Sequence, residues 1–337
     1  STDIIFKDGG AENMRITDAG LVGIGTSAPT AMLTVTGDIT ANNFAGRNRI
    51  INGDFAIWQR GTSFSPGANA QVYTADRFFM NRNGVSEWTV ARQGYSEQYS
   101  CRVQRNVSTT STQAMRVRQV LESANCGGIV GETVTFSCEI KVGANFSGAS
   151  SNIFLTIAQG SGNDETGGKM ATGFTGVVTT SSTIVGTTSF VKYSVTSGVI
   201  GATISQLGVL IEATPVGTAG ANDWYEVRNV QLEVGATATE FEVRSVGNTL
   251  ALCQRYYQKF TTLVGNSTHS WQGGGGSSWS VLTPPVQPRA SPTMATTPAS
   301  GSGATWLALA AVPGATYYQE AANSVNTTAV VTADAEL

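Results

Sequence analysis

The stretch TVTFSCEIKV, residues 133–142, alternates apolar and polar side chains from end to end. One face carries five apolar side chains: Val134, Phe136, Cys138, Ile140 and Val142. Alternation with a period of two is typical of a β-strand that buries one face and exposes the other to water. We therefore expect a strand here, with Cys138 buried as a small hydrophobic residue.

The same pattern recurs on both sides of this stretch, from residue 46 to residue 245. About nine segments alternate in this way, including SNIFLTIAQG (151–160) and DWYEVRNVQLEVG (223–235), and turn signals separate them roughly every 10 to 20 residues. Long helical periodicity is nearly absent. Many short strands with frequent turns predict an all-β protein whose largest domain, 46–245, is a β-sandwich.

Residues 1–45 contain three or four very short alternating segments, each with one apolar face. So few strands cannot bury their own apolar faces, because isolated hairpins are only marginally stable in water. We expect several copies of the chain to cover these faces and to form an interlaced, oligomeric β-stalk with closed symmetry. The alternation predicts an oligomer and does not fix the number of copies.

The glycine-rich stretch GLVGIGTSAP, residues 20–29, lies inside this stalk and invites comparison with a phosphate-binding loop. Its glycines fall as G-x-x-G-x-G rather than G-x-G-x-x-G, and Pro29 and an alternating segment follow in place of a helix. Phosphate-binding loops present the anion to the N-terminus of a helix. We therefore interpret the stretch as strands and turns, and we predict no nucleotide site.

The stretch GNTLALCQRYYQKF breaks the alternation. Three of its residues are spaced as on one helix face: Leu250, Cys253 and Tyr257. Asn248 or Thr249 is the expected N-cap, because such side chains accept hydrogen bonds from the first helical amides. The pattern predicts a short helix over 246–258 that links two domains.

Strand patterns return after this helix, and we expect residues 259–337 to form a small C-terminal β-domain. The segments SWSVLTPPVQPR and TTAVVTADAEL belong to it. Proline cannot donate to a strand ladder, so four prolines restrict any strand beside them to a sheet edge: Pro284, Pro285, Pro288 and Pro292.

The composition excludes several classes of function. Charged residues make up 13% of the 337 residues and the net charge is −3, so the chain lacks the basic face that nucleic-acid binding requires. No segment approaches the roughly 20 apolar residues of a membrane span. The four cysteines form no C-x-x-C pair and no short spacing with the single histidine, so we predict no metal and no cofactor. Their spacing leaves two disulfides or free thiols as alternatives.

Several stretches resemble bacteriophage tail fibres. Residues 14–44, MRITDAGLVGIGTSAPTAMLTVTGDITANNF, resemble the repetitive stalk segments of these proteins. RNRIINGDFAIWQRG (47–61) and NVQLEVGATATEFEVRSVGNTLALCQRYYQKF (229–260) are similar to their receptor-binding regions, and PVQPRASPTM (285–294) and TADAEL (332–337) to their C-terminal domain. The resemblance implies a homotrimer located in a virion tail fibre, with other tail or baseplate proteins as partners.

The middle block is also similar to jelly-roll carbohydrate-binding modules. Its opening matches theirs at Asn52, Gly53, Asp54 and Phe55. Its closing strand matches theirs at Trp224, Tyr225, Val227, Asn229 and Val230. Arg228 stands where those modules often carry an aspartate that helps to hold calcium, and its fixed positive charge argues against a bound calcium here.

Candidate carbohydrate-binding residues lie near the sequence QGGGGSS. Trp271 and Trp279 bracket this polar loop, and His269 precedes it, in a setting where an aromatic ring has little core to join. Exposed aromatic rings stack on the C–H faces of sugars. Packing of these side chains beneath their own loop is the alternative, and Tyr317 and Tyr318 are weaker candidates of the same kind.

Two pairs of carboxylates are candidate hydrolytic groups: Glu240 with Glu242, which share one face of an expected strand in TEFEV (239–243), and Asp164 with Glu165. Neither pair has a recognisable aromatic groove, so we predict no catalytic residues and no enzyme activity. The expected function is a non-enzymatic virion protein of the tail fibre that recognises host-surface polysaccharide or lipopolysaccharide. The alternatives are a tailspike-type polysaccharide depolymerase and a secreted bacterial adhesin or glycan-binding module.

Overall fold

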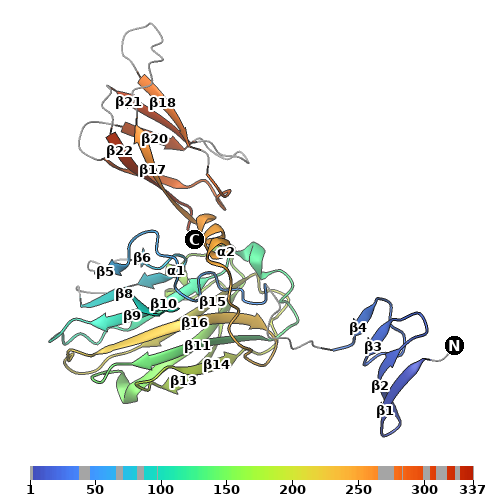
Figure 1. Ribbon diagram of the computed structural model, residues 1–337. Helices are drawn as coiled ribbons and strands as arrows, with labels where there is room; N and C mark the ends of the chain where they lie inside the picture. The colour runs from blue at the N-terminus through green and yellow to red at the C-terminus, as the bar shows by residue number, and fades with distance from the viewer. Residues whose placement is uncertain are drawn as a thin grey trace. The chain divides into compact units, whose positions relative to one another are not determined.

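Strands dominate the computed structural model, as the alternating sequence predicts (Figure 1). The all-β fold class is therefore confirmed. The chain divides into two compact units, Ser1–Phe44 and Ala45–Leu337. The structure describes these residues: 3–37, 46–65, 71–81, 87–96, 98–264, 277–282, 284–298, 304–308, 317–322 and 327–336.

The N-terminal unit is one four-stranded sheet in the order β1-β2-β3-β4. Neighbouring strands pair antiparallel, except that β3 and β4 are parallel. Gly25 turns the chain after β3 with a φ of +71°, a conformation that favours glycine. The strands are β1 (Ile4–Asp8), β2 (Ala11–Ile16), β3 (Val22–Ile24) and β4 (Leu33–Val35).

Apolar side chains of this sheet lie exposed in the single chain. Ile4 is 56% exposed, Phe6 52%, Met32 73% and Leu33 57%. Contiguous exposed apolar surface is typical of a site where another polypeptide packs. The interlaced, trimeric arrangement of this segment stays a prediction.

The second unit contains two six-stranded sheets, which overlie one another in Figure 1 and share one core. The predicted β-sandwich is therefore present. Sheet I has the order β14 (Val191–Thr196), β11 (Val134–Val142), β16 (Trp224–Val234), β9 (Gln98–Arg105), β8 (Trp88–Tyr95) and β5 (Ser63–Phe64). Sheet II has the order β13 (Val178–Val185), β12 (Asn152–Gly160), β15 (Gln206–Ala213), β10 (Met115–Val120), β7 (Phe79–Asn81) and β6 (Gln71–Tyr73).

The core between the two sheets follows the sequence alternation. All five apolar side chains of TVTFSCEIKV are buried on the inner face of β11, and Cys138 is 1% exposed. Trp58 and Trp88 also lie in this core. The four cysteines are buried free thiols, so the disulfide alternative does not apply to this structure.

One strand departs from strict alternation. On β16, Gln231 pairs with Ser137 but Arg228 pairs with Glu139, so β16 carries one extra residue at a β-bulge. Asn229 occupies the bulge with a φ of 53°. A bulge shifts the side-chain period by one residue, so Trp224, Glu226 and Arg228 lie on the outer face before the bulge while Gln231 and Glu233 take that face after it.

Short helices flank the sandwich. Helix α1 (Gly167–Thr172) covers part of the outer face of sheet II, where Met170 packs with Val120, Ala158 and Phe174. Two 3₁₀ turns, η1 (Ser123–Cys126) and η2 (Ala149–Ser151), lie in connections between strands.

Helix α2 (Val246–Gln254) is the predicted linking helix, but two details of the prediction are wrong. Its N-cap is Ser245, whose hydroxyl accepts a hydrogen bond from the amide of Asn248, so neither Asn248 nor Thr249 is the cap. The helix also ends at Gln254 rather than at 258, because the next strand begins at Tyr257. Cys253 anchors the helix in a small buried cluster.

The C-terminal residues form two three-stranded sheets. The proline-rich stretch leads into β19, which is an edge strand as expected. The first sheet has the order β17 (Tyr257–Val264), β22 (Thr327–Asp334) and β19 (Thr293–Pro298). The second has the order β18 (Ser277–Leu282), β21 (Tyr317–Ala322) and β20 (Ala304–Ala308).

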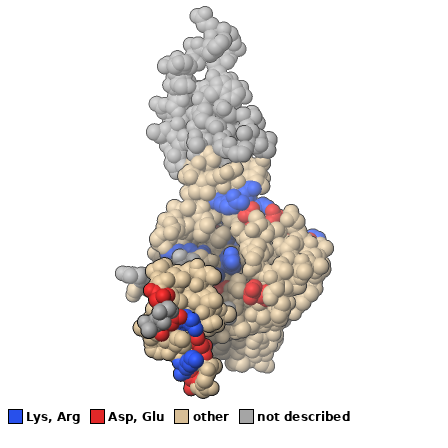
Figure 2. All heavy atoms as spheres, turned by 90° about the vertical axis from the view of Figure 1, so that its right-hand side faces the viewer, with Lys and Arg blue, Asp and Glu red and all other residues tan. Residues whose placement is uncertain are grey.

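The described surface drawn in Figure 2 carries few charged side chains, in keeping with the low charged fraction of the sequence. Within the described part of the chain, no helix is both long enough and apolar enough to cross a membrane.

Candidate functional site

The predicted carbohydrate-binding residues near QGGGGSS are only partly covered by the structure. His269 and Trp271 lie outside the described residues. Trp279 lies in strand β18, opposite Glu320 of β21, so its assignment to a loop was wrong. The binding role of Trp271, Trp279 and His269 stays a prediction.

The predicted strand around Glu240 and Glu242 is absent, because residues 239–245 adopt no regular structure. Glu242 accepts hydrogen bonds from the amides of Gly46 at 2.9 Å and Asn48 at 2.7 Å. Burial alone would raise the pKa of Glu242, but these amides and the charge of Arg244 outweigh it and hold the pKa below its ordinary value. Glu242 is therefore held ionised by contacts within the chain, and it fastens the start of the sandwich to the segment after β16.

The second pair of carboxylates is also engaged. Asp164 accepts from the amide of Ser123 at 2.8 Å and from Arg289 at 2.9 Å. Partial burial raises the pKa of Asp164, but these partners lower it further than burial raises it. The pKa of Glu165 is lowered chiefly by the amide of Thr175. Both carboxylates brace loops, and neither has the raised pKa of an acid catalyst.

The sequence stretches that resemble receptor-binding regions meet in a buried joint between the sandwich and the C-terminal strands. Arg77 forms an ion pair with Glu336, with 2% and 4% of the two side chains exposed. The guanidinium of Arg77 also stacks on Tyr256, 3.6 Å from the ring centroid. We call the following residues the joint: Arg60, Arg77, Glu122, Asp164, Tyr256, Tyr257, Arg289, Asp334 and Glu336.

An ion pair, a stacking contact and a hydrogen bond complete the joint. Arg60 pairs with Asp334 at 3.1 Å and stacks on Tyr257 at 3.6 Å. The hydroxyl of Tyr256 donates to Glu122 at 3.0 Å. Most polar groups here have partners within the protein, so the joint holds two parts of the chain together and leaves little for a ligand to bind.

The Asn-Gly-Asp-Phe opening of the sandwich is structural too. The amide side chain of Asn52 donates to the carbonyls of Ile57 at 2.8 Å and Asp76 at 3.0 Å. A Cβ atom at Gly53 would collide with the carbonyl oxygen of Val230, so glycine is required there. Asn52 and Gly53 therefore fix the path of the first segment of the sandwich where it passes close to β16.

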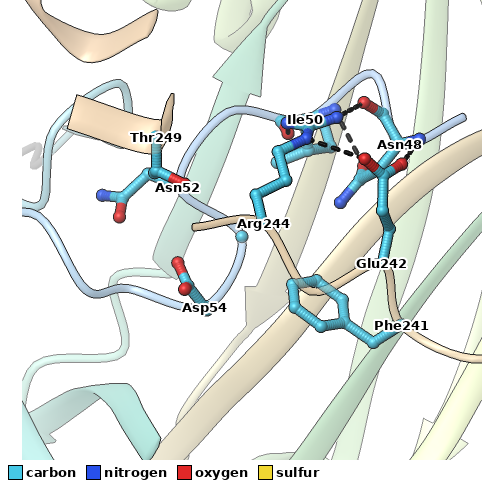
Figure 3. Close-up of a pocket in the computed structure, with 9 residues that line it drawn as sticks. Asn48, Ile50, Asn52, Asp54, Phe241, Glu242, Arg244 and Thr249 are labelled. Carbon is cyan, nitrogen blue, oxygen red and sulfur yellow. Dashed lines mark hydrogen bonds and ion pairs between the residues drawn. The ribbon is translucent and has the colours of Figure 1, made fainter. Parts of the chain in front are cut away.

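Figure 3 shows the small pocket beside this opening, where Glu242 and Arg244 point toward Asn48. Its volume is about 10 Å³, enough for a single water molecule. Burial raises the pKa of Asp54 at its edge. No group of three or more His, Cys, Asp or Glu side chains in the described ranges could hold a metal ion.

A larger hollow of about 510 Å³ lies beside helix α2. Its charged members are already paired, Arg244 with Glu242 and Arg255 with Glu122. The hollow therefore offers an apolar wall with few free polar groups. It is lined by Gly46, Glu242, Arg244, Asn248, Ala251, Leu252, Arg255 and Val286.

A different group of side chains gathers on the outer face of sheet I. Aromatic rings and charged groups from β8, β9, β11 and β16, together with the residue before β14, contact one another there. The guanidinium of Arg102 lies 4.2 Å from the ring centroid of Trp224, and that of Arg228 lies 4.0 Å from Phe190. We call this the outer-face cluster: Tyr95, Arg102, Glu139, Lys141, Phe190, Trp224, Glu226 and Arg228.

Lys141 lies at the centre of the outer-face cluster. Its Nζ atom is 4.4 Å from the ring centroid of Tyr95, 4.8 Å from Phe190 and 5.5 Å from Trp224. The three rings are each partly exposed. Tyr95 and Phe190 meet edge to face at 5.8 Å, an arrangement that holds both rings in place.

Two carboxylates bind the cations of the cluster and hold them in place. Glu226 is fully buried and accepts from Tyr95, Ser100 and Arg102 at 2.6, 2.9 and 2.7 Å. Glu139 accepts from Arg228 at 2.8 Å. Arg228, whose charge argues against a bound calcium, is thus held in an ion pair with Glu139 on the outer face of sheet I.

The sequence carries a signal for this cluster, although none of its residues was predicted to bind carbohydrate. Trp224, Glu226 and Arg228 occupy alternate positions, and the register places Glu226 opposite Lys141. A tryptophan in line with charged residues lies on the polar face of its strand, not in the core. Trp58 and Trp88, by contrast, are buried.

Comparison with known proteins finds solved structures that are similar to this chain at low sequence identity. No protein-family model matches the chain. No curated protein matches it either. Among solved structures, it is similar to a CBM4 carbohydrate-binding module with 15% identity and a TM-score of 0.31, over 55% of this chain and 98% of that one.

Two further solved structures have different functions from each other. The CBM22-2 xylan-binding domain of Paenibacillus barcinonensis Xyn10C is 14% identical with a TM-score of 0.29, over 47% of this chain and 92% of that one. A cyclase from Fischerella sp. TAU is 12% identical with a TM-score of 0.34, over 56% and 96%. The function of the present chain is therefore inferred from its own residues.

Proposed function

We propose that this protein is a non-enzymatic glycan-binding protein that binds through the outer-face cluster of sheet I. The observation that carries the proposal is the set of three partly exposed rings, Tyr95, Phe190 and Trp224, among ordered polar groups on a sheet face. Aromatic rings stack on the C–H faces of sugars while neighbouring polar groups bind the hydroxyls. Each ring is held by its neighbours, which limits the entropy lost on binding.

The open half of this face is bounded by the protein itself. Beyond the bulge at Asn229, Glu233 accepts from both the amide and the hydroxyl of Thr239, at 2.9 and 2.6 Å, so the returning chain covers that end of β16. The half that carries Trp224 and Arg228 has no such cover among the described residues. A sugar chain would therefore bind beside Trp224 rather than along the whole sheet.

The proposed setting is a virion tail fibre, in which homotrimers recognise host-surface polysaccharide or lipopolysaccharide and contact other tail or baseplate proteins. The sequence resemblance supports this setting. The exposed apolar side chains of the N-terminal unit, such as Phe6 and Met32, support self-association. Three weak sites in one assembly give avidity well above the affinity of one site.

Binding of the full chain to an immobilised panel of neutral and acidic bacterial polysaccharides tests the proposed site. We expect Trp224→Ala to abolish measurable binding. Trp279→Ala and Trp271→Ala probe the site predicted near QGGGGSS. Full binding by Trp224→Ala, with loss in either of the other two variants, would move the site to the C-terminal strands.

Two further measurements test the setting. Light scattering of the full chain should give three times the mass of one chain, and a monomer would contradict the stalk. Incubation with the polysaccharides that bind should release no new reducing ends. Their appearance would favour the depolymerase alternative.

A further inference from the structure

We propose that the glycan bound at the outer-face cluster is acidic, a polysaccharide whose sugars carry carboxylate groups. The inference rests on the proposed function, since it names the class of ligand for the same site. It follows from which hydrogen-bonding groups of the cluster are already used and which charges remain.

The acceptors of the cluster are used internally. A carboxylate offers about four lone-pair positions. The carboxylate of Glu226 accepts from the hydroxyls of Tyr95 at 2.6 Å and Ser100 at 2.9 Å, and from two nitrogens of Arg102 at 2.7 and 2.5 Å. Its lone-pair positions are therefore occupied. Its side chain is 0% exposed, so no ligand reaches it.

The second carboxylate is nearly as occupied. Glu139 accepts from two nitrogens of Arg228 at 2.8 and 2.7 Å, and from the side-chain Nδ2 of Asn229 at 2.8 Å. Three of its roughly four positions are therefore taken. Little acceptor capacity is left for the hydroxyl hydrogens of a sugar.

Donors and positive charge remain at the surface. The side chains of Arg102, Lys141 and Arg228 are 26%, 16% and 19% exposed. These three cations face two carboxylates, Glu139 and Glu226, so the cluster has a net charge of +1 (three minus two). Glu139 is 24% exposed, but its carboxylate is engaged by Arg228 and Asn229, and Glu226 lies beneath the cations.

A neutral sugar does not match this surface well. Each sugar hydroxyl both donates and accepts, and a site rich in donors leaves its hydrogens without partners. A carboxylate only accepts, and it forms short, charge-assisted hydrogen bonds with arginine and lysine. The rings of Phe190 and Trp224, which lie against Arg228 and Arg102, would pack on the sugar that bears the acid.

The other sheet provides a contrast within the same molecule. On the outer face of sheet II, Arg116 pairs with Glu212, one cation with one carboxylate. The exposure of the Arg116 side chain, 25%, is close to that of Arg102. Arg116 therefore serves as a matched control for a change of charge at the outer-face cluster.

The test uses the full chain and a panel of uronate-bearing bacterial polysaccharides, each paired with a derivative whose carboxylates have been reduced to alcohols. The derivative keeps the backbone and linkages and carries a neutral hydroxymethyl group in place of each carboxylate. We expect at least one acidic polysaccharide to bind about tenfold more tightly than its reduced form, with the difference shrinking as salt rises. Equal binding of acidic and reduced forms would overturn the inference and leave glycan binding intact. No binding to any polysaccharide, neutral or acidic, would contradict the proposed function itself.

A pair of variants assigns the effect to the cluster. Arg228→Gln should weaken binding of the acidic form about fivefold, the size expected for one partly exposed charge, and weaken binding of the reduced form by clearly less. Arg116→Gln should change neither. Equal weakening of both forms by Arg228→Gln would show that Arg228 only supports the structure, and would count against the inference.

Discussion

The joint and the outer-face cluster are built from the same parts and differ in exposure. In both, arginines stack on aromatic rings and pair with carboxylates, as Arg77 does with Tyr256 and Glu336, and Arg228 with Phe190 and Glu139. Arg77 is 2% exposed and Arg228 is 19% exposed. The same chemistry thus closes a contact within the chain at one place and leaves a surface for another molecule at the other.

The largest effect is expected in the joint. Arg77→Met leaves the carboxylate of Glu336 buried without its main partner, which should lower the free energy of unfolding by about 3 to 5 kcal/mol. Chemical denaturation measures this loss, with Arg116→Met as the exposed control that should lose less than about 1 kcal/mol. A loss below about 1 kcal/mol in Arg77→Met would mean that the joint does not depend on this pair.

In the outer-face cluster, a substitution should weaken glycan binding and change the stability of the fold little. Phe190→Ala removes a partly exposed ring that lies 4.0 Å from Arg228 and 4.8 Å from Lys141. We expect about tenfold weaker glycan binding and a change of less than about 1 kcal/mol in the free energy of unfolding. A large loss of stability with unchanged affinity would make the cluster a structural element like the joint.

The joint should also depend on pH through Asp164. Its native pKa lies below the ordinary value, so its stabilising contribution is present above the unfolded pKa of about 4 and is lost as the pH falls through the native pKa. Asp164→Asn should lower the free energy of unfolding by less than about 1 kcal/mol at pH 6, and by less still at pH 3. An equal difference between variant and parent at both pH values would contradict this assignment.

The smallest effect is expected at the cysteines. Burial raises the pKa of all four thiols, in Cys126 to about 11. The thiolate is the reactive form, so the native chain should not react with a thiol reagent at neutral pH. Denaturant should expose four reactive groups. Rapid labelling of the native chain would show that the core opens readily.

Local patterns in the sequence were sufficient for most of the sandwich. The alternation of TVTFSCEIKV predicted both β11 and its buried face, because side chains on a strand simply alternate. The end of helix α2 was harder, because Tyr256 and Tyr257 fit a helical pattern while their rings are bound by Arg77 and Arg60. Long-range contacts of this kind leave no local signal.

The candidate site could not be predicted from any one segment, because it depends on how distant segments of the chain pair and cover one another. The extra residue at Asn229 shifts the face of every later residue in β16. The exposure of Trp224 also depends on where the chain after β16 returns, near Thr239. Conversely, residues of the stretches that resemble receptor-binding regions, such as Arg60 and Tyr257, serve attachment within the chain.

The C-terminal strands begin and end at one place, since Tyr257 at the start of β17 pairs with Asp334 at the end of β22. Both of these residues are fixed by Arg60. The C-terminal strands therefore leave from and return to one two-strand stem. A replacement module joined at these two residues would therefore also have to keep Arg289, whose ion pair with Asp164 ties the intervening portion to the sandwich.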